Sequence, residues 1–315
     1  SDHPLRGFRY QKHNPFSYKP GGFARGAGHG ATFQDNHGSY WHVSTIFISV
    51  KNNFERRIGI WPAGFDQDGV MFSNTAYGDY PTLLPEFAKG KDFTKGLFSG
   101  WMLLNYNKPV LVSSTLGGLQ PNFAVDEDIK TFWSAETGKK GEWFQTDLGQ
   151  LSTVRAIQLN YADQDVEFLG KTLGNYHRYK IYASENGKSW KTIVDKSKNT
   201  TDVPHDYIEL PSPVKARYLK MENLHMPTGK FALSGFRVFG KGSGPKPDTV
   251  KNFVALRANA EKYGERRSIW FKWQLNPLAD GYVIYWGKSP DKLYGSIMVY
   301  GANEYYFTGA DRTDS

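Results

Sequence analysis

Residues Ala124–Leu159, with the sequence AVDEDIKTFWSAETGKKGEWFQTDLGQLSTVRAIQL, carry the clearest structural signal in this 315-residue chain. Aromatic and β-branched residues fill two runs of this stretch, and such residues suit half-buried strands. Gly, Asp and Ser, which are typical of turns, stand between the runs. Similar runs recur downstream at the spacing of a β-sandwich. The predicted strands are Glu142–Gly149, Val154–Tyr161, Tyr179–Ser184, Ala216–Asn223 and Ser234–Gly240.

The composition of the whole chain indicates mostly β structure and excludes several classes of function. Aromatic residues make up 16% and there are 33 glycines, whereas long stripes with the helical period are missing. Cys is absent, which excludes disulfides and thiolate zinc sites. The net charge is +8, but the basic residues are scattered, so we expect no nucleic-acid partner. No run approaches the ~18 apolar residues of a membrane span.

The first part, residues 1–105, alternates strand-like runs with tight turns. Residues that tolerate a left-handed backbone lie at Asp35–Gly38 and Asp66–Gly69, each between two such runs. Two consecutive hairpins would make a four-stranded antiparallel unit, the size of one β-propeller blade. A small independent β-sandwich is the alternative.

Residues 106–241 contain the predicted sandwich strands, and a Gly-, Pro- and Lys-rich linker follows at residues 242–248. Residues 249–315 hold two alternating runs, SIWFKWQL and GYVIYWGKS, that are typical of another sandwich. This last part has about seventy residues, fewer than the ~100 of an immunoglobulin-like domain, so we expect it to be truncated.

The middle of the chain resembles the discoidin, or coagulation-factor type C, domain, whose bacterial members include carbohydrate-binding module family 32. The resemblance implies a jelly-roll β-sandwich. It is carried, in order, by Ala124, Asp126, Thr131, Trp133, Ser134, Trp143–Gly149, Tyr179, Ile181, Ser184, Gly187, Trp190, Arg217–Lys220 and Gly235–Gly240.

A structural calcium is expected in the short turn that contains Asp126, Asp128 and Thr131. Calcium takes several oxygen ligands, and members of the family often hold this ion at the matching loop. An Asx-type turn without an ion is the alternative. Trp133 and Trp143 match positions that are mainly core in the family, so we expect both to pack inside rather than to stack on a sugar.

A glycan ligand, if the domain binds one, should contact the loops at one end of the sandwich, where binding residues usually lie. The candidate segments are residues 161–176 and 225–230. The sequence does not single out the contacting side chains within them.

The first part resembles the closing portion of a glycoside hydrolase family 43 domain, through SDHPLRGF at residues 1–8, GHG at 28–30 and ERRIG at 55–59. Those enzymes are five-bladed propellers that cleave arabinose-, xylose- or galactose-containing polysaccharides, usually with inversion. The last part resembles a fibronectin type III domain that lacks its final strands. The expected fold is all-β: a partial five-bladed β-propeller, then a discoidin-type jelly-roll β-sandwich, then an incomplete fibronectin III-like sandwich.

The resemblance implies functional roles for two residues of the first part. His29 matches a histidine that points to the propeller axis and helps to hold a central calcium, directly or through water, or to orient the substrate; a hydrogen-bonded core histidine is the alternative. Its flanking glycines would let strands crowd together there. Arg56 matches a residue that binds the sugar, with a surface salt bridge as the alternative. His37 should be exposed in a turn, and His42 should pack on one face of the sheet.

The catalytic acids are not expected in this chain. Inverting glycosidases need two carboxyls about 6.5–9.5 Å apart, and in the family they lie upstream of the GHG strand. We therefore expect the C-terminal part of an exported glycosidase, periplasmic or on the cell surface, of the arabinofuranosidase, xylosidase or galactanase type. It would act on a plant-type polysaccharide or oligosaccharide and be inactive without its N-terminal propeller blades. The alternative is a non-catalytic lectin or adhesin built on the discoidin domain.

Overall fold

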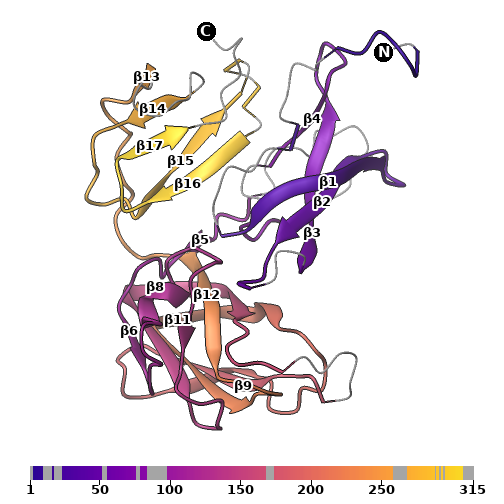
Figure 1. Cartoon of the computed structure of the whole chain (residues 1–315). Helices are drawn as coiled ribbons and strands as arrows, with labels where there is room; N and C mark the ends of the chain where they lie inside the picture. Colours follow the sequence, from indigo (N-terminus) through magenta and orange to yellow (C-terminus); the bar gives the residue numbers. More distant parts are fainter. Residues whose placement is uncertain are drawn as a thin grey trace. The chain divides into compact units, whose positions relative to one another are not determined.

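The chain is all-β, as predicted. The computed structural model describes residues 3–9, 16–17, 23–51, 55–75, 79–83, 98–167, 174–257, 268–287, 289–290, 292–293 and 295–307. Within these residues the regular elements are β-strands and one short 3₁₀ helix, η1 (Pro121–Ala124) (Figure 1). The chain forms two compact units, one of residues 1–46, 57–97 and 245–315, the other of residues 47–56 and 98–244. The described part contains no helix long and apolar enough to cross a membrane.

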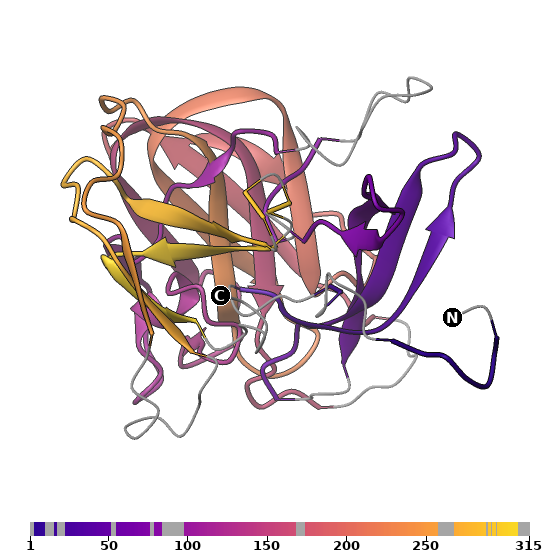
Figure 2. The same cartoon turned by 90° about the horizontal axis from the view of Figure 1, so that it is seen from above.

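The N-terminal strands form one four-stranded sheet in the order β1-β2-β3-β4, which confirms the two predicted hairpins. Figures 1 and 2 show these strands side by side. The strands are β1 (Arg25–Gln34), β2 (Tyr40–Phe47), β3 (Arg56–Phe65) and β4 (Met71–Ser73).

The two hairpin turns are built alike, around an aspartate at the first position. Asp35 Oδ1 accepts hydrogen bonds from the N–H groups of His37 and Ser39, both at 2.9 Å. Asp66 Oδ1 accepts from the corresponding N–H groups two and four residues on, at 2.9 and 2.8 Å. A glycine with positive φ, Gly38 or Gly69, completes each turn, because a left-handed residue is required at that position.

The two faces of this sheet differ in burial. Along β3, Trp61 and Ala63 are buried, with exposed fractions of 2% and 1%. The alternate residues Ile58 and Ile60 are 78% and 53% exposed. Side chains of a strand point alternately to opposite faces, so one face packs inside while the other presents branched apolar side chains to solvent.

The middle part is a β-sandwich whose strands pair in the order β10-β9-β11-β8-β12-β5, with β6 added to β8 and β7 to β12. All five strands predicted for it are present, but Glu142–Gly149 and Val154–Tyr161 are covered by the single long strand β8. Strand β11 pairs with β8, and the register shifts between Glu209 and Val214 and again between Ala216 and Tyr218. The strands are β5 (Met102–Leu103), β6 (Val110–Val112), β7 (Trp133–Ser134), β8 (Trp143–Tyr161), β9 (Arg178–Ser184), β10 (Lys191–Asp195), β11 (His205–His225) and β12 (Ala232–Lys241).

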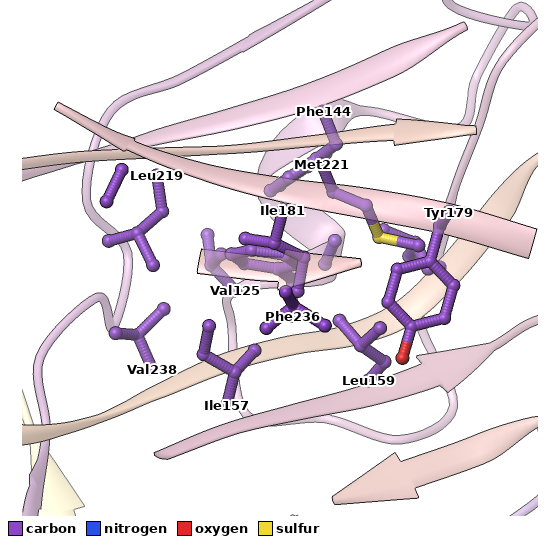
Figure 3. Close-up of a cluster of buried hydrophobic side chains, with 14 of the residues drawn as sticks. Val125, Phe144, Ile157, Leu159, Tyr179, Ile181, Leu219, Met221, Phe236 and Val238 are labelled. Atoms are coloured by element: carbon purple, nitrogen blue, oxygen red, sulfur yellow. The ribbon is translucent and has the colours of Figure 1, made fainter. Parts of the chain in front are cut away.

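The core of the sandwich collects side chains from β8, β9, β11 and β12, which point into one interior (Figure 3). Fully burying one such side chain stabilises the fold by roughly 1.5–3 kcal/mol. The residues labelled in Figure 3 are Val125, Phe144, Ile157, Leu159, Tyr179, Ile181, Leu219, Met221, Phe236 and Val238.

Only one of the two tryptophans expected in the core lies there. Trp133 is fully buried and contacts Phe144 and Phe231, with ring centres 5.3 Å apart in both cases. Trp143 is half-buried, and Lys220 Nζ lies 4.4 Å from the centre of its ring. The reason is strand alternation: Phe144 points inward, so its neighbour Trp143 points to the outer face.

The C-terminal part consists of a three-stranded sheet, β13-β14-β17, and a two-stranded sheet, β15-β16. The two strand runs predicted from the sequence correspond to β14 and β15. A core of Trp273, Tyr282, Ile284, Ile297 and Val299 lies in this part. The strands are β13 (Val254–Arg257), β14 (Ile269–Lys272), β15 (Gly281–Trp286), β16 (Gly295–Tyr300) and β17 (Glu304–Phe307).

A buried ion pair ties the segment after η1 to the sandwich. Arg237 of β12 is 2% exposed and donates from Nε and Nη2 to the two carboxylate oxygens of Glu127, both at 2.8 Å. Its Nη1 donates to Gln158 Oε1 of β8 at 2.7 Å, and its guanidinium lies over the ring of Phe239 at 4.8 Å. Glu127 has a φ of 61°, so the pair holds a left-handed residue in place.

Replacing Arg237 by Leu should destabilise the sandwich by about 3–5 kcal/mol, because it leaves the Glu127 carboxylate buried without its partner. Urea unfolding monitored by hydrogen exchange of the β8 and β12 amides measures this in the sandwich alone. Arg217→Leu is the control, because Arg217 forms a similar pair with Asp147 but is 41% exposed; we expect at most about 1 kcal/mol there. Equal losses in the two variants would contradict a special role for the buried pair.

Candidate functional site

Four connections of the sandwich meet at the end where β9 begins and β11 ends. Arg178, the first residue of β9, pairs with His225, the last residue of β11. Tyr161, the last residue of β8, pairs with Leu233 near the start of β12. Strand β5 instead pairs with the far end of β12, next to the linker. The described part of the loop end is therefore formed by residues 135–142, 162–167, 174–177, 196–204 and 226–231, away from the linker.

Hydrogen bonds hold the described parts of two of these loops together. Lys230 N donates to the carbonyl of Gln164 at 2.9 Å, and Lys230 Nζ lies 2.8 Å from Asp165 Oδ2. Gly229, with a φ of 70°, approaches so closely that an added Cβ would lie 2.5 Å from the Gln164 carbonyl oxygen. Both loops belong to the segments predicted as glycan contacts, and the structure brings them together.

The third loop is anchored by a buried asparagine. Asn223 Nδ2 donates to the carbonyls of Gly138 and Lys139, both at 3.0 Å. The N–H of Gly141 donates in turn to the Asn223 carbonyl at 2.9 Å. These bonds hold the backbone of the loop before any ligand arrives, which lowers the entropic cost of binding.

An aromatic and cationic cluster lies on the loop end, made of Tyr176, Arg178 and His225. The guanidinium of Arg178 lies 4.7 Å from the centre of the Tyr176 ring, and its Nη2 donates to Tyr176 Oη at 3.2 Å. Arg178 Nε donates to the Asn199 carbonyl at 3.0 Å. The rings of Tyr176 and His225 are 5.1 Å apart. All three side chains are half-buried, so each keeps a surface that a ligand can reach.

A buried histidine lies beneath this cluster. The ring of His177 stacks on Tyr161 with centres 3.9 Å apart, and the residue is 8% exposed. Among the described residues, neither His177 Nδ1 nor Tyr161 Oη has a hydrogen-bond partner. Burial lowers the pKa of His177 to about 3, and the nearby His225 and His205 act in the same direction. His177 is therefore a neutral packing element of the site.

The structure brings together the three residues predicted to hold calcium. Thr131 Oγ1 donates to Asp126 Oδ2 at 2.7 Å and lies 2.9 Å from the Asp128 carbonyl. Asp126 Oδ1 accepts from the N–H of Asp128 at 2.9 Å. Burial raises the pKa of Asp126, and the charge of Asp128 adds to it, against the hydrogen bonds from Thr131 and the Asp128 N–H. Nowhere in the described ranges do three or more acidic or histidine side chains form a metal cluster, so further oxygens would have to come from carbonyls or water.

The two residues predicted at the sugar site of the first part lie in different compact units. His29 is exposed on β1 with a φ of 48°. The Arg56 guanidinium lies 5.1 Å from the centre of the Phe47 ring. None of the contacts described for His29 and Arg56 tests their predicted roles at a sugar site, so both roles stay predictions.

His37 and His42, the two other histidines of β1, β2 and the turn between them, have the predicted exposure. His37 is exposed in its turn. His42 is 6% exposed, and its Nδ1 is 3.0 Å from Thr32 Oγ1. A Cβ on Gly30 would lie 2.5 Å from His42 Nε2 and 2.6 Å from the Val43 carbonyl oxygen, so these two neighbours require a glycine there. Gly28 has open space around it.

Sequence reasoning did not single out Arg178, His177 or His225 as individual site residues. His225 and Tyr176 lie at the edges of the predicted segments, and Arg178 lies two residues beyond one of them. Their only signal is the polar-aromatic run NYHR immediately before a predicted strand. Its meaning depends on the pairing of β9 with β11, which no local pattern reveals.

His177→Phe should weaken the pH dependence of the sandwich's stability. The folded-state pKa of His177 is about 3, below the ordinary histidine pKa of 6.5, so the neutral side chain's contribution is present above pH 6.5 and is lost as the pH falls towards 3. The slope is at most about 1.4 kcal/mol per pH unit. Urea unfolding of both proteins at pH 4.5 and 7.5, followed by the β8 and β12 amides, measures it. Identical slopes would show that His177 is not kept neutral by the fold.

Comparison with known proteins found one protein family whose model matches the sandwich. The F5/8 type C domain model matches residues 110–235. Neuropilin-1a of Danio rerio is 34% identical over 118 residues, which are 34% of this chain and 12% of neuropilin-1a. The chain thus spans a small fraction of the curated relative that it matches.

Similar solved structures include chitosan-binding module 1 of a chitosanase/glucanase from Paenibacillus sp. IK-5. It is 24% identical, the match covers 44% of this chain and 99% of the module, and the TM-score is 0.38. Another is the family 32 carbohydrate-binding module of C. perfringens NanJ in complex with galactose. It is 16% identical, the match covers 44% of this chain and 98% of the module, and the TM-score is 0.36. A structure described as a glycoside hydrolase is 19% identical. The match covers 69% of this chain and 47% of the hydrolase, and the TM-score is 0.36. On the family model and the strand order, residues 110–235 form an F5/8 type C, or discoidin, domain.

Proposed function

We propose that the discoidin domain binds a carbohydrate through its loop end. The observation that carries this proposal is the cluster of Tyr176, Arg178 and His225 on hydrogen-bonded loops. A half-exposed aromatic ring offers an apolar face to a sugar ring, while the guanidinium and imidazole beside it can bond to hydroxyls. Binding sites of this kind combine apolar surface with a few placed polar groups.

We propose further that the parent protein is a polysaccharide-degrading glycosidase of the inverting arabinofuranosidase, xylosidase or galactanase type. The sheet β1–β4 has the strand number and order of one propeller blade. Its outer face, with Ile58 and Ile60 exposed, has the apolar character that a neighbouring blade would cover. In this proposal His29 and Arg56 serve the sugar and calcium site of the complete propeller, and the catalytic acids lie outside this chain.

The C-terminal sheets fit the proposal of an incomplete fibronectin III-like domain. Within the described residues this part contains a sheet of three strands and a sheet of two, and a pair of antiparallel sheets is the architecture of a sandwich of this type. A spacer domain of this kind would hold the binding domain at a distance from its neighbours. Export to the periplasm or cell surface follows from a polysaccharide target.

The second candidate is a non-catalytic lectin or adhesin. It is favoured by the fact that the loop end lies within one compact unit, residues 98–244 with 47–56, and needs no acid from another domain in order to bind. Both candidates require glycan binding, and they differ in whether the parent protein cleaves its ligand.

The intact chain should bind arabino-, xylo- or galacto-oligosaccharides on a glycan array, and Tyr176→Ala should lower the affinity roughly tenfold because it removes the stacking ring. Tyr285→Ala, at a 42% exposed tyrosine of the C-terminal part, is the control and should bind normally. The same preparation should not hydrolyse aryl arabinofuranosides or xylosides. Binding of no glycan on the array would overturn the binding proposal. Hydrolysis of an aryl arabinofuranoside or xyloside would show that catalytic acids are present.

We also propose that calcium binds in the turn of Asp126, Asp128 and Thr131. The Asp126 carboxylate and the Asp128 carbonyl both lie within hydrogen-bonding distance of the Thr131 hydroxyl, and the Asp128 carboxylate belongs to the same turn. These are ligands of the kind that calcium takes. The raised pKa of Asp126 shows that burial and the Asp128 charge disfavour its anionic form, and a cation would relieve both effects.

Calcium at a hundredfold excess over its Kd should then stabilise the sandwich by about 2.7 kcal/mol, and Asp126→Asn should abolish this gain. Thermal unfolding in calcium and in EDTA measures both. Asp195→Asn is the control, since Asp195 is an exposed acid paired with Lys180. Unchanged unfolding of the wild type in the two buffers would favour the Asx-type turn without an ion.

A further inference from the structure

The guanidinium of Arg178 has an unusual position at the loop end. Two of its nitrogens are oriented by neutral groups, Nε by the Asn199 carbonyl and Nη2 by Tyr176 Oη. Among the described residues no carboxylate lies within ion-pairing distance of it. Arginine is always charged and carries five N–H donors in a planar fork, so several donors of a fixed cation stay open to a ligand.

Two acids of the segment that follows the Asn199 turn have hydrogen-bond partners other than Arg178. Asp202 Oδ2 accepts a hydrogen bond from Asn175 Nδ2 at 2.9 Å. Asp206 Oδ2 accepts from Tyr179 Oη at 2.7 Å and lies 3.3 Å from Lys196 Nζ. The turn that carries Asn199 adds an exposed lysine, Lys198. Among the described residues Arg178 therefore has no carboxylate partner of its own, and an exposed lysine lies in the turn that it contacts.

We propose that the cluster of Tyr176, Arg178 and His225 binds the carboxylate of an acidic sugar, such as a hexuronic acid residue of a polysaccharide. This inference rests on the proposed glycan-binding function and specifies its ligand class. The planar guanidinium matches a carboxylate in a two-point hydrogen bond, and the Tyr176 ring lies beside it to receive the apolar face of the same sugar.

His225 and the net charge of the chain are both consistent with an anionic ligand. Burial lowers the pKa of His225, and the positive charge of Arg178 lowers it further, so His225 serves as a neutral hydrogen-bonding group for sugar hydroxyls. The net charge of +8 raises the local concentration of anionic polymers around the chain and speeds their association.

The test compares two trisaccharides, trigalacturonate and its neutral counterpart galactotriose, by calorimetry on the intact chain. The uronate should bind at least tenfold more tightly than galactotriose in 50 mM salt, and this ratio should shrink in 500 mM salt, where charges are screened. Arg178→Gln should reduce the ratio on the order of tenfold or more, since hydrogen bonds to charged groups are the strong ones.

Two further variants separate charge from fold. Arg178→Lys keeps the positive charge but removes the planar fork, and it should recover only part of the preference. Lys188→Gln removes one exposed positive charge at the other end of β9 and should leave the ratio unchanged. Thermal unfolding of each variant shows whether the loop end is intact.

The outcomes are distinguishable. Galactotriose bound as tightly as trigalacturonate by the wild type would overturn the acidic-sugar inference while the glycan-binding function stands. A preference that Lys188→Gln lowers as much as Arg178→Gln would also overturn it, because the effect would then be one of net charge. Binding of neither sugar, nor of any glycan on an array, would overturn the proposed function itself.

Discussion

The buried ion pair between Arg237 and Glu127 is the interaction on which the sandwich depends. It joins β12 and β8 to the segment that leads into Trp133, and it holds Glu127 in a left-handed conformation that a non-glycine residue seldom adopts. Two buried charges are costly unless both are fully bonded, and here the third nitrogen of Arg237 bonds Gln158. The pair therefore contributes chain register more than net stability, and the turn of Asp126 is positioned as a consequence.

The loop end takes its rigidity from this core. Strands β8 and β11 are long, antiparallel and buried along their inner faces, so their ends are fixed in space. The main-chain bond from Lys230 to Gln164 then joins two loops, and the side chain of Asn223 holds a third loop to β11. A ligand meets Tyr176 and Arg178 already placed, which reduces the entropy lost on binding. The site is preorganised because Arg178 and His225 lie at strand ends and Tyr176 lies two residues before β9.

The first sheet represents a different physical situation. Trp61 and Ala63 of β3 are buried on one face, whereas Ile58 and Ile60 are exposed on the other face. Exposed branched apolar residues along one strand are unfavourable in an isolated domain and common where sheets stack. This contrast within one strand is the main physical support for a blade-like role, and it is independent of any sugar chemistry.

The resemblance to the discoidin family predicted that domain and the burial of Trp133, but its prediction for Trp143 was wrong, because the neighbour Phe144 points inward and Trp143 points to the outer face. Local patterns in the sequence were enough to predict the strands and both Asp-to-Gly turns, because alternation and turn chemistry act over a few residues. Local patterns did not single out Arg178, because its partners Asn199 and His225 lie 21 and 47 residues away along the chain. Which donor stays unpaired is a property of long-range strand pairing, and strand pairing is set by the whole buried core rather than by any short segment.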